Sequence, residues 1–190
     1  MGECLQQFDI EPRICSMVKY SPNTETSGPT LMFAHYANDH KGICVEYKVD
    51  FNKFNKKTNV SYGEVNYQQK DKAEDLKDLY MLKDPAWQYE HEFRFVRFDN
   101  KEFAAAKVTG ITFGLKCPQA HRDIVRYLLP EEVAYKEMAY KGVGNKIIQQ
   151  NVTWQSEKIS SEEAFKLMLN EDLTHLYFYH QQRADTAKLV

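Results

Sequence analysis

The stretch from Leu31 to Tyr47 constrains the fold most, because it joins two apolar segments through a glycine. Residues 31–38 are typical of a short helix, and the polar residues that follow are typical of a helix end. Gly42 then leads into residues 43–49, which are apolar on both faces and predict a strand near the centre of a sheet. A helix followed directly by a buried strand is therefore the first expectation.

Three polar side chains interrupt this apolar stretch: His35, Tyr36 and His40. His35 is either a core histidine bonded to the backbone or a polar pocket residue beside Tyr36. Together with Cys44, the two histidines give the pattern H-x4-H-x3-C, which is not a zinc-ligand spacing. The sequence therefore predicts no metal site here.

A second dense stretch begins at Trp87 and is typical of a strand from about residue 91. The alternation of a strand places three charged side chains on one face: Glu90, Glu92 and Arg94. One interpretation is a solvated face with an ion pair from Arg94 to Glu92 or Glu90. The other is a cleft wall, where a carboxylate binds a ligand hydroxyl or acts as base, and Trp87 or Tyr89 offers a stacking face.

The remaining elements mix helices and strands without a regular βαβ rhythm, which favours an α+β fold. We expect a central mixed or antiparallel sheet with helices packed on it. The predicted strands cover residues 13–18, 60–67, 103–107, 109–115 and 147–154, and the predicted helices cover 71–82, 118–129 and a segment from Ser160. We expect residues 1–140 to form the core of a single α+β domain, and residues 141–190 to be a C-terminal extension packed on it.

Several local features carry expectations of their own. Thr30 is expected to cap the first helix, with Pro29 outside it. Residues 51–57 are typical of a polar turn or of one helical turn. In the helix 118–129, we expect a solvated face at His121, Arg122 and Arg126. Cys15 and Cys44 are expected to be small buried residues within strands.

Charge and cysteine usage narrow the class of protein. The net charge of −2 gives no global basic field for nucleic acid or an anionic membrane. The four cysteines form no C-x-x-C pair, which indicates a reducing, cytoplasmic compartment. The N-terminus has no signal-peptide pattern, and no apolar run approaches the length of a membrane span.

Two blocks of the sequence resemble a large bacterial family of unknown function. The first reads LMFAHYA at 31–37 and HKGICV at 40–45, and the second reads Lys83 followed by WQYEHEFR at 87–94. The likeness covers about residues 13–129, with Phe33 where the family usually has tryptophan. The family's N-terminal motifs are missing, so the resemblance implies a shortened member. In the family these motifs lie near an N-terminal strand, and loss of that strand would leave an open sheet edge through which a homo-oligomer could form.

The order of the blocks is also weakly similar to that of ADP-ribosyltransferase-type folds. That analogy implies NAD as a ligand and a cleft with Glu92 and His35 as catalytic residues. The binding residues would then be Tyr36, His40, Trp87, Tyr89, Glu90 and Arg94. The alternative is a non-catalytic binding or interaction module, in phage defence or stress response, whose polar blocks are structural and whose partner is a small molecule or a protein.

Overall fold

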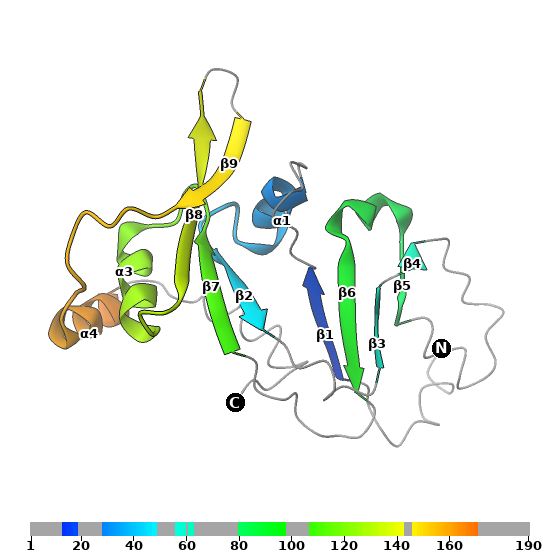
Figure 1. The fold of residues 1–190 in the computed structure, drawn as a ribbon, viewed down its shortest axis with the longest axis horizontal. Coiled ribbons are helices and arrows are strands. Elements are labelled where there is room, and N and C mark those ends of the chain that lie inside the picture. Colours follow the sequence, from blue (N-terminus) through cyan, green and yellow to red (C-terminus); the bar gives the residue numbers. More distant parts are fainter. Residues whose placement is uncertain are drawn as a thin grey trace. The chain divides into compact units, whose positions relative to one another are not determined.

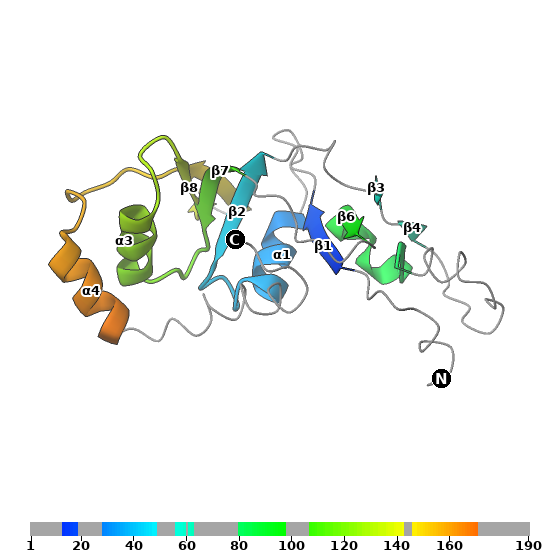
Figure 2. The same ribbon diagram turned by 90° about the horizontal axis from the view of Figure 1, so that it is seen from below.

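The computed structural model has an α+β fold, as the sequence predicts (Figures 1 and 2). It describes residues 13–18, 28–48, 56–59, 61–62, 80–97, 107–142 and 146–170. The chain divides into two compact units. The first unit comprises Met1–Thr26, Asp50–Ala105 and Arg183–Val190, and the second comprises Ser27–Val49 and Ala106–Gln182. The predicted C-terminal extension from residue 141 stays a prediction.

The first unit contains an antiparallel sheet in the order β1-β6-β3. Its strands are β1 (Arg13–Val18), β6 (Glu92–Arg97) and β3 (Lys56–Asn59). Two short parallel strands, β4 (Ser61–Tyr62) and β5 (Leu82–Lys83), precede a 3-10 helix, η4 (Pro85–Glu90). Cys15 and Phe95 are both buried and lie opposite each other in the β1–β6 register. The predicted strands at 13–18 and after residue 91 are thus confirmed.

The second unit contains a mixed sheet in the order β2-β7-β8-β9. Its strands are β2 (Ile43–Lys48), β7 (Lys107–Phe113), β8 (Ala134–Lys141) and β9 (Lys146–Asn151). β7 and β8 are parallel, whereas the two outer pairs are antiparallel. Its helices are α1 (Gly28–Tyr36), α3 (Gln119–Leu128) and α4 (Ser161–Asn170).

Each face of this mixed sheet has its own core. On one face, Ile111 and Phe113 of β7 pack with Val125 of α3. On the other face, Phe33 and Ala37 at the end of α1 pack with Met138 of β8. Figures 1 and 2 show α3 and α1 on opposite sides of the sheet, with α4 beside α3. Because side chains alternate along a strand, β8 contributes Tyr135 to the first core and Met138 to the second.

Some local expectations are wrong. β2 lies at the end of the described sheet rather than at its centre, and Cys44 on it is exposed. Thr30 lies inside α1, which already begins at Gly28, so it is not the cap. His121 is 1% exposed, so its predicted place on a solvated face is wrong. It lies three and four residues before Ile124 and Val125, which places all three on the buried face of α3.

Other expectations meet the described residues only in part. Within the predicted polar turn at 51–57, Lys56 and Lys57 belong to β3, because they pair with β6. The predicted strand at 60–67 is described only as Ser61–Tyr62. The helix predicted over 71–82 is wrong where it is described, because Tyr80 and Met81 form a turn and Leu82 begins β5. The rest of that helix lies outside the described residues, as does the strand predicted at 103–107 except for Lys107, which begins β7. The segment 175–180 also lies outside the described residues.

Candidate functional site

The segment before β6 sets the geometry of the candidate site. Asp84 caps η4, because its Oδ1 accepts a hydrogen bond of 2.8 Å from the backbone N–H of Ala86, and Pro85 suits the first turn. His91 ends η4 in the left-handed conformation, with φ of 45°. The chain therefore turns between Glu90 and Glu92, and only Glu92 belongs to the strand. Both carboxylates nonetheless approach one lysine.

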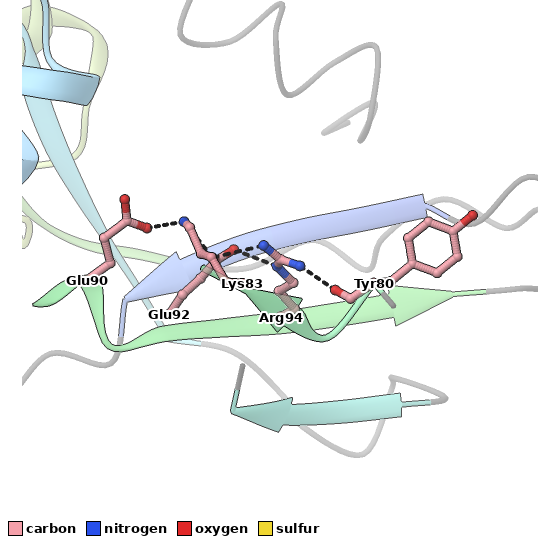
Figure 3. Close-up of polar contacts among 5 residues, drawn as sticks. All are labelled: Tyr80, Lys83, Glu90, Glu92 and Arg94. Atoms are coloured by element: carbon pink, nitrogen blue, oxygen red, sulfur yellow. Dashed lines mark hydrogen bonds and ion pairs between the residues drawn. The ribbon is translucent and has the colours of Figure 1, made fainter. Parts of the chain in front are cut away.

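Four charged side chains form a network in the first unit, which we call the Lys83 network (Figure 3): Lys83, Glu90, Glu92 and Arg94. The ammonium group of Lys83 lies between the two carboxylates; it pairs with Glu90 and lies 2.9 Å from Oε2 of Glu92. Arg94 donates two parallel hydrogen bonds to Glu92, from Nε at 2.7 Å and from Nη2 at 3.0 Å. Its Nη1 donates to the backbone carbonyl of Tyr80.

Burial makes this network energetically important. Glu90 is 3% exposed and Glu92 is 5% exposed, so neither carboxylate is hydrated as it would be at a surface. Burial by itself would raise the pKa of Glu92. Hydrogen bonds from Arg94, Ser16 and Lys83 outweigh it and lower the pKa to about 2. Glu92 therefore stays ionised at neutral pH.

Lys83 responds in the complementary sense. Burial would lower the pKa of its ammonium group, but the hydrogen bonds to Glu90 and Glu92 outweigh that effect and raise it. Lys83 therefore stays charged between the two carboxylates. Two positive and two negative side chains compensate one another, which is what buried charges require.

The predictions made for Glu90, Glu92 and Arg94 have different outcomes. The predicted pair of Glu92 and Arg94 is present. The interpretation of these residues as a solvated face is wrong, because both carboxylates are buried. The interpretation as a cleft wall stays a prediction.

Trp87 and Tyr89 are brought together on η4. Their ring centroids lie 6.1 Å apart with the planes tilted by 36°, and both side chains are partly buried. The ammonium group of Lys83 lies 5.4 Å from the Trp87 ring, within the range of a cation–π interaction. The charge network and the aromatic pair are thus parts of one local structure.

The other predicted site residues lie in the second unit. His35 and Tyr36 are exposed at the end of α1, and their rings meet edge to face at 6.2 Å. The interpretation of His35 as a core histidine is therefore wrong. His40 is instead the buried histidine of this stretch, at 7% exposed. A cleft shared by His35 and Glu92 stays a prediction.

Sequence reasoning missed two members of the site. Lys83 was visible only as the first residue of the second family block, four positions before Trp87. That spacing indicated a contact, because η4 turns the chain so that Lys83 pairs with Glu90 of the same block. Ser16 could be found only through the register of β1 and β6, in which it lies opposite Arg94. The Tyr80 carbonyl left no signal in the sequence.

Two general features of the described residues bear on the site. Among them, no group of three or more histidine, cysteine, aspartate and glutamate side chains is placed to hold a metal ion. No helix in the described ranges has both the length and the apolar character needed to cross a membrane.

Residues 32–95 match the model of a family described as Protein of unknown function (DUF2971). This range includes the whole of the second sequence block and the first block except Leu31, and so confirms the predicted resemblance to a family of unknown function. No curated protein and no solved structure matches the chain significantly. The similarity to ADP-ribosyltransferase-type folds stays a prediction.

Proposed function

We propose that the chain is a non-catalytic binding module, in which the Lys83 network holds in place the turn that presents Trp87 and Tyr89 to a ligand. Lys83 contacts the carboxylates on either side of this turn and also the Trp87 ring. The network therefore couples the position of the aromatic pair to the strand β6. A rigid aromatic pair loses little conformational entropy when a ligand binds.

The occupied carboxylate of Glu92 is the observation that carries this proposal. A carboxylate offers about four acceptor positions. Glu92 already accepts two hydrogen bonds from Arg94, one from Lys83 and one from Ser16. A ribose hydroxyl would have to displace one of these charged donors. With a pKa of about 2, the carboxylate is also a weak proton acceptor.

The aromatic pair indicates the class of ligand. Tryptophan and tyrosine rings bind planar groups by stacking, and stacking on a nucleobase is worth about 1–3 kcal/mol. The proposal therefore keeps the predicted binding role of Trp87 and Tyr89 and omits the predicted catalytic role of Glu92. We propose a planar small molecule, such as a nucleobase, as the ligand of this module.

Tryptophan fluorescence tests the proposal directly, because the chain has two tryptophans. The variant Trp154→Phe leaves Trp87 as the reporter. Titration with AMP and UMP is expected to quench it saturably. Tyr89→Ala should weaken binding roughly tenfold or more, whereas the matched control Tyr89→Phe keeps the ring and should bind like the parent. If neither nucleotide changes the emission saturably in the folded Trp154→Phe protein, the aromatic pair is not such a site.

A second candidate function, transfer from NAD, is supported by the ionised state of Glu92. An ionised carboxylate stabilises the positive charge of an oxocarbenium-like transition state. Calorimetry with NAD and transfer of label from NAD to proteins of a cell extract test this candidate. It requires activity that Glu92→Gln abolishes while the variant remains folded. Absence of both NAD binding heat and transfer contradicts it.

A further inference from the structure

The turn that follows α1 has an unusual backbone. Three consecutive residues other than glycine lie in the left-handed region: Asn38 (φ 47°), Asp39 (φ 51°) and His40 (φ 66°). Side chains of L-residues crowd the backbone in this region, so a run of three is strained. Such a conformation persists only where surrounding contacts hold it.

The loop after β7 supplies contacts that hold this turn. The carbonyl of His40 accepts a hydrogen bond of 3.0 Å from the N–H of Lys116, and the carbonyl of Gly42 accepts one of 3.0 Å from the N–H of Gly114. A Cβ atom on Gly114 would lie 2.1 Å from the carbonyl oxygen of His40, so only glycine allows this approach. The turn is thus pinned by its backbone to one loop.

The His40 side chain is buried inside this turn. Its ring stacks on Phe33 with centroids 5.8 Å apart and planes within 10°. Within the described residues, its buried Nδ1 has no hydrogen-bond partner. Two charged groups act on the ring: Asp39 from the turn and Lys116 from the loop, which pair with each other at 2.6 Å. Because these two charges oppose each other, neither provides a dedicated counter-ion for a protonated His40.

We propose that His40 is a proton-sensitive latch, which keeps residues 37–42 closed against the Gly114–Lys116 loop when neutral and releases them when protonated. A neutral imidazole tolerates the stacked, buried position. An imidazolium there lacks water and a hydrogen-bond acceptor at Nδ1. Opening the turn returns the ring to water and also relieves the strained backbone.

The direction of the pH effect follows from the environment of the ring. Burial lowers the pKa of His40, Asp39 raises it, Lys116 lowers it, and the net direction is downward from 6.5. The open turn has the ordinary pKa of about 6.5. Below that pH the open form binds a proton that the closed form does not, so closure weakens by up to about tenfold per pH unit until the lower pKa is passed.

Hydrogen exchange of the full chain measures this opening at its two closing bonds. The protection factors of the Gly114 and Lys116 amides, corrected for the intrinsic pH dependence of exchange, are expected to fall as the pH drops from about 7.5 to about 5. His40→Asn should abolish this fall, because asparagine accepts the left-handed conformation and does not titrate. Constant protection of both amides over this range in the parent protein overturns the proposal.

Two surface variants provide a matched pair that does not depend on His40→Asn folding. Asp39→Asn and Lys116→Gln each remove the same exposed ion pair, but they change the charge near His40 in opposite senses. Asp39→Asn is expected to lower the pKa of His40, read from its ring signals by NMR, and to deepen the loss of protection. Lys116→Gln is expected to raise that pKa and to reduce the loss. A shift in the same direction in both variants overturns the latch.

Discussion

At the scale of single residues, Arg94 is the partner on which the buried charge of Glu92 depends most. Arg94→Met is expected to lower the free energy of unfolding by about 3–5 kcal/mol, because it leaves a buried carboxylate poorly compensated. Urea denaturation measures this loss. The double variant Glu92→Leu, Arg94→Met should be the more stable of the two, since Lys83 still pairs with Glu90 and no uncompensated carboxylate remains. Equal losses in the single and double variants contradict this account.

Two glycines of the second unit, Gly114 and Gly110, are expected to differ in how much stability is lost when each is replaced by alanine. A Cβ on Gly114 meets the backbone of His40, whereas a Cβ on Gly110 lies 2.7 Å from the movable carboxylate of Glu46. Gly114→Ala is therefore expected to cost about 3 kcal/mol of stability. Gly110→Ala should cost about 1 kcal/mol or less, mainly by displacing Glu46 from Lys136, 3.0 Å away. Denaturation followed by Trp154 fluorescence compares them, and a larger loss in Gly110→Ala would reverse the argument.

Only part of the candidate site could be predicted from the sequence. Glu92 and Arg94 could be predicted as a pair, because they are two apart in a strand. Their burial could not, because it depends on Lys83, which reaches them through the 3-10 helix, and on Ser16, which reaches them through strand register. The Ser16 contact joins segments distant in sequence, and the Lys83 contact depends on how η4 turns the chain between residues 83 and 92. Local periodicity carries no information about them.

At the scale of elements, α4 begins with the capping box that its sequence predicts. Ser160 Oγ accepts a hydrogen bond from the N–H of Glu163 at 3.3 Å, and the Glu163 carboxylate accepts from the N–H of Ser160 at 2.9 Å. Ser160→Ala is expected to cost about 1 kcal/mol, whereas Ser160→Thr keeps the hydroxyl and should cost less. Thermal denaturation compares the two. Similar losses in both would show that the hydroxyl contributes little to this helix.

Elements were predictable where local chemistry alone defines them. The α3 helix lies between Pro118 and Pro130, and its periodicity gave the correct range within one residue at each end. The position of β2 was not predictable in this way. β2 pairs with β7 along one edge, and Ile43 and Val45 pack against the core that contains Val125 of α3. This strand at the end of the sheet therefore has an apolar sequence like that of a central strand. A hydrophobic pattern does not by itself give the order of strands in a sheet.

At the scale of the whole molecule, acid is expected to remove the stability that Glu92 supplies to the first unit. Its folded pKa of about 2 lies below the ordinary 4.5, so its contribution is complete above about pH 4.5 and is lost as the pH falls towards 2. The stability difference between the wild type and Glu92→Gln should therefore shrink over that interval. Urea midpoints measured at several pH values test it. A difference independent of pH would mean that the ionised carboxylate is not what stabilises this unit.

The two compact units each contain one tryptophan, Trp87 in the first and Trp154 in the second. Each unit also has its own buried residues, such as Phe95 in the first and Phe113 in the second. We therefore expect Arg94→Met to shift the unfolding transition reported by Trp87 in a Trp154→Phe background. Gly114→Ala should shift the transition reported by Trp154 in a Trp87→Phe background. If either variant moved both transitions equally, the units would unfold as one cooperative structure, because substitutions in independent units change only their own stability.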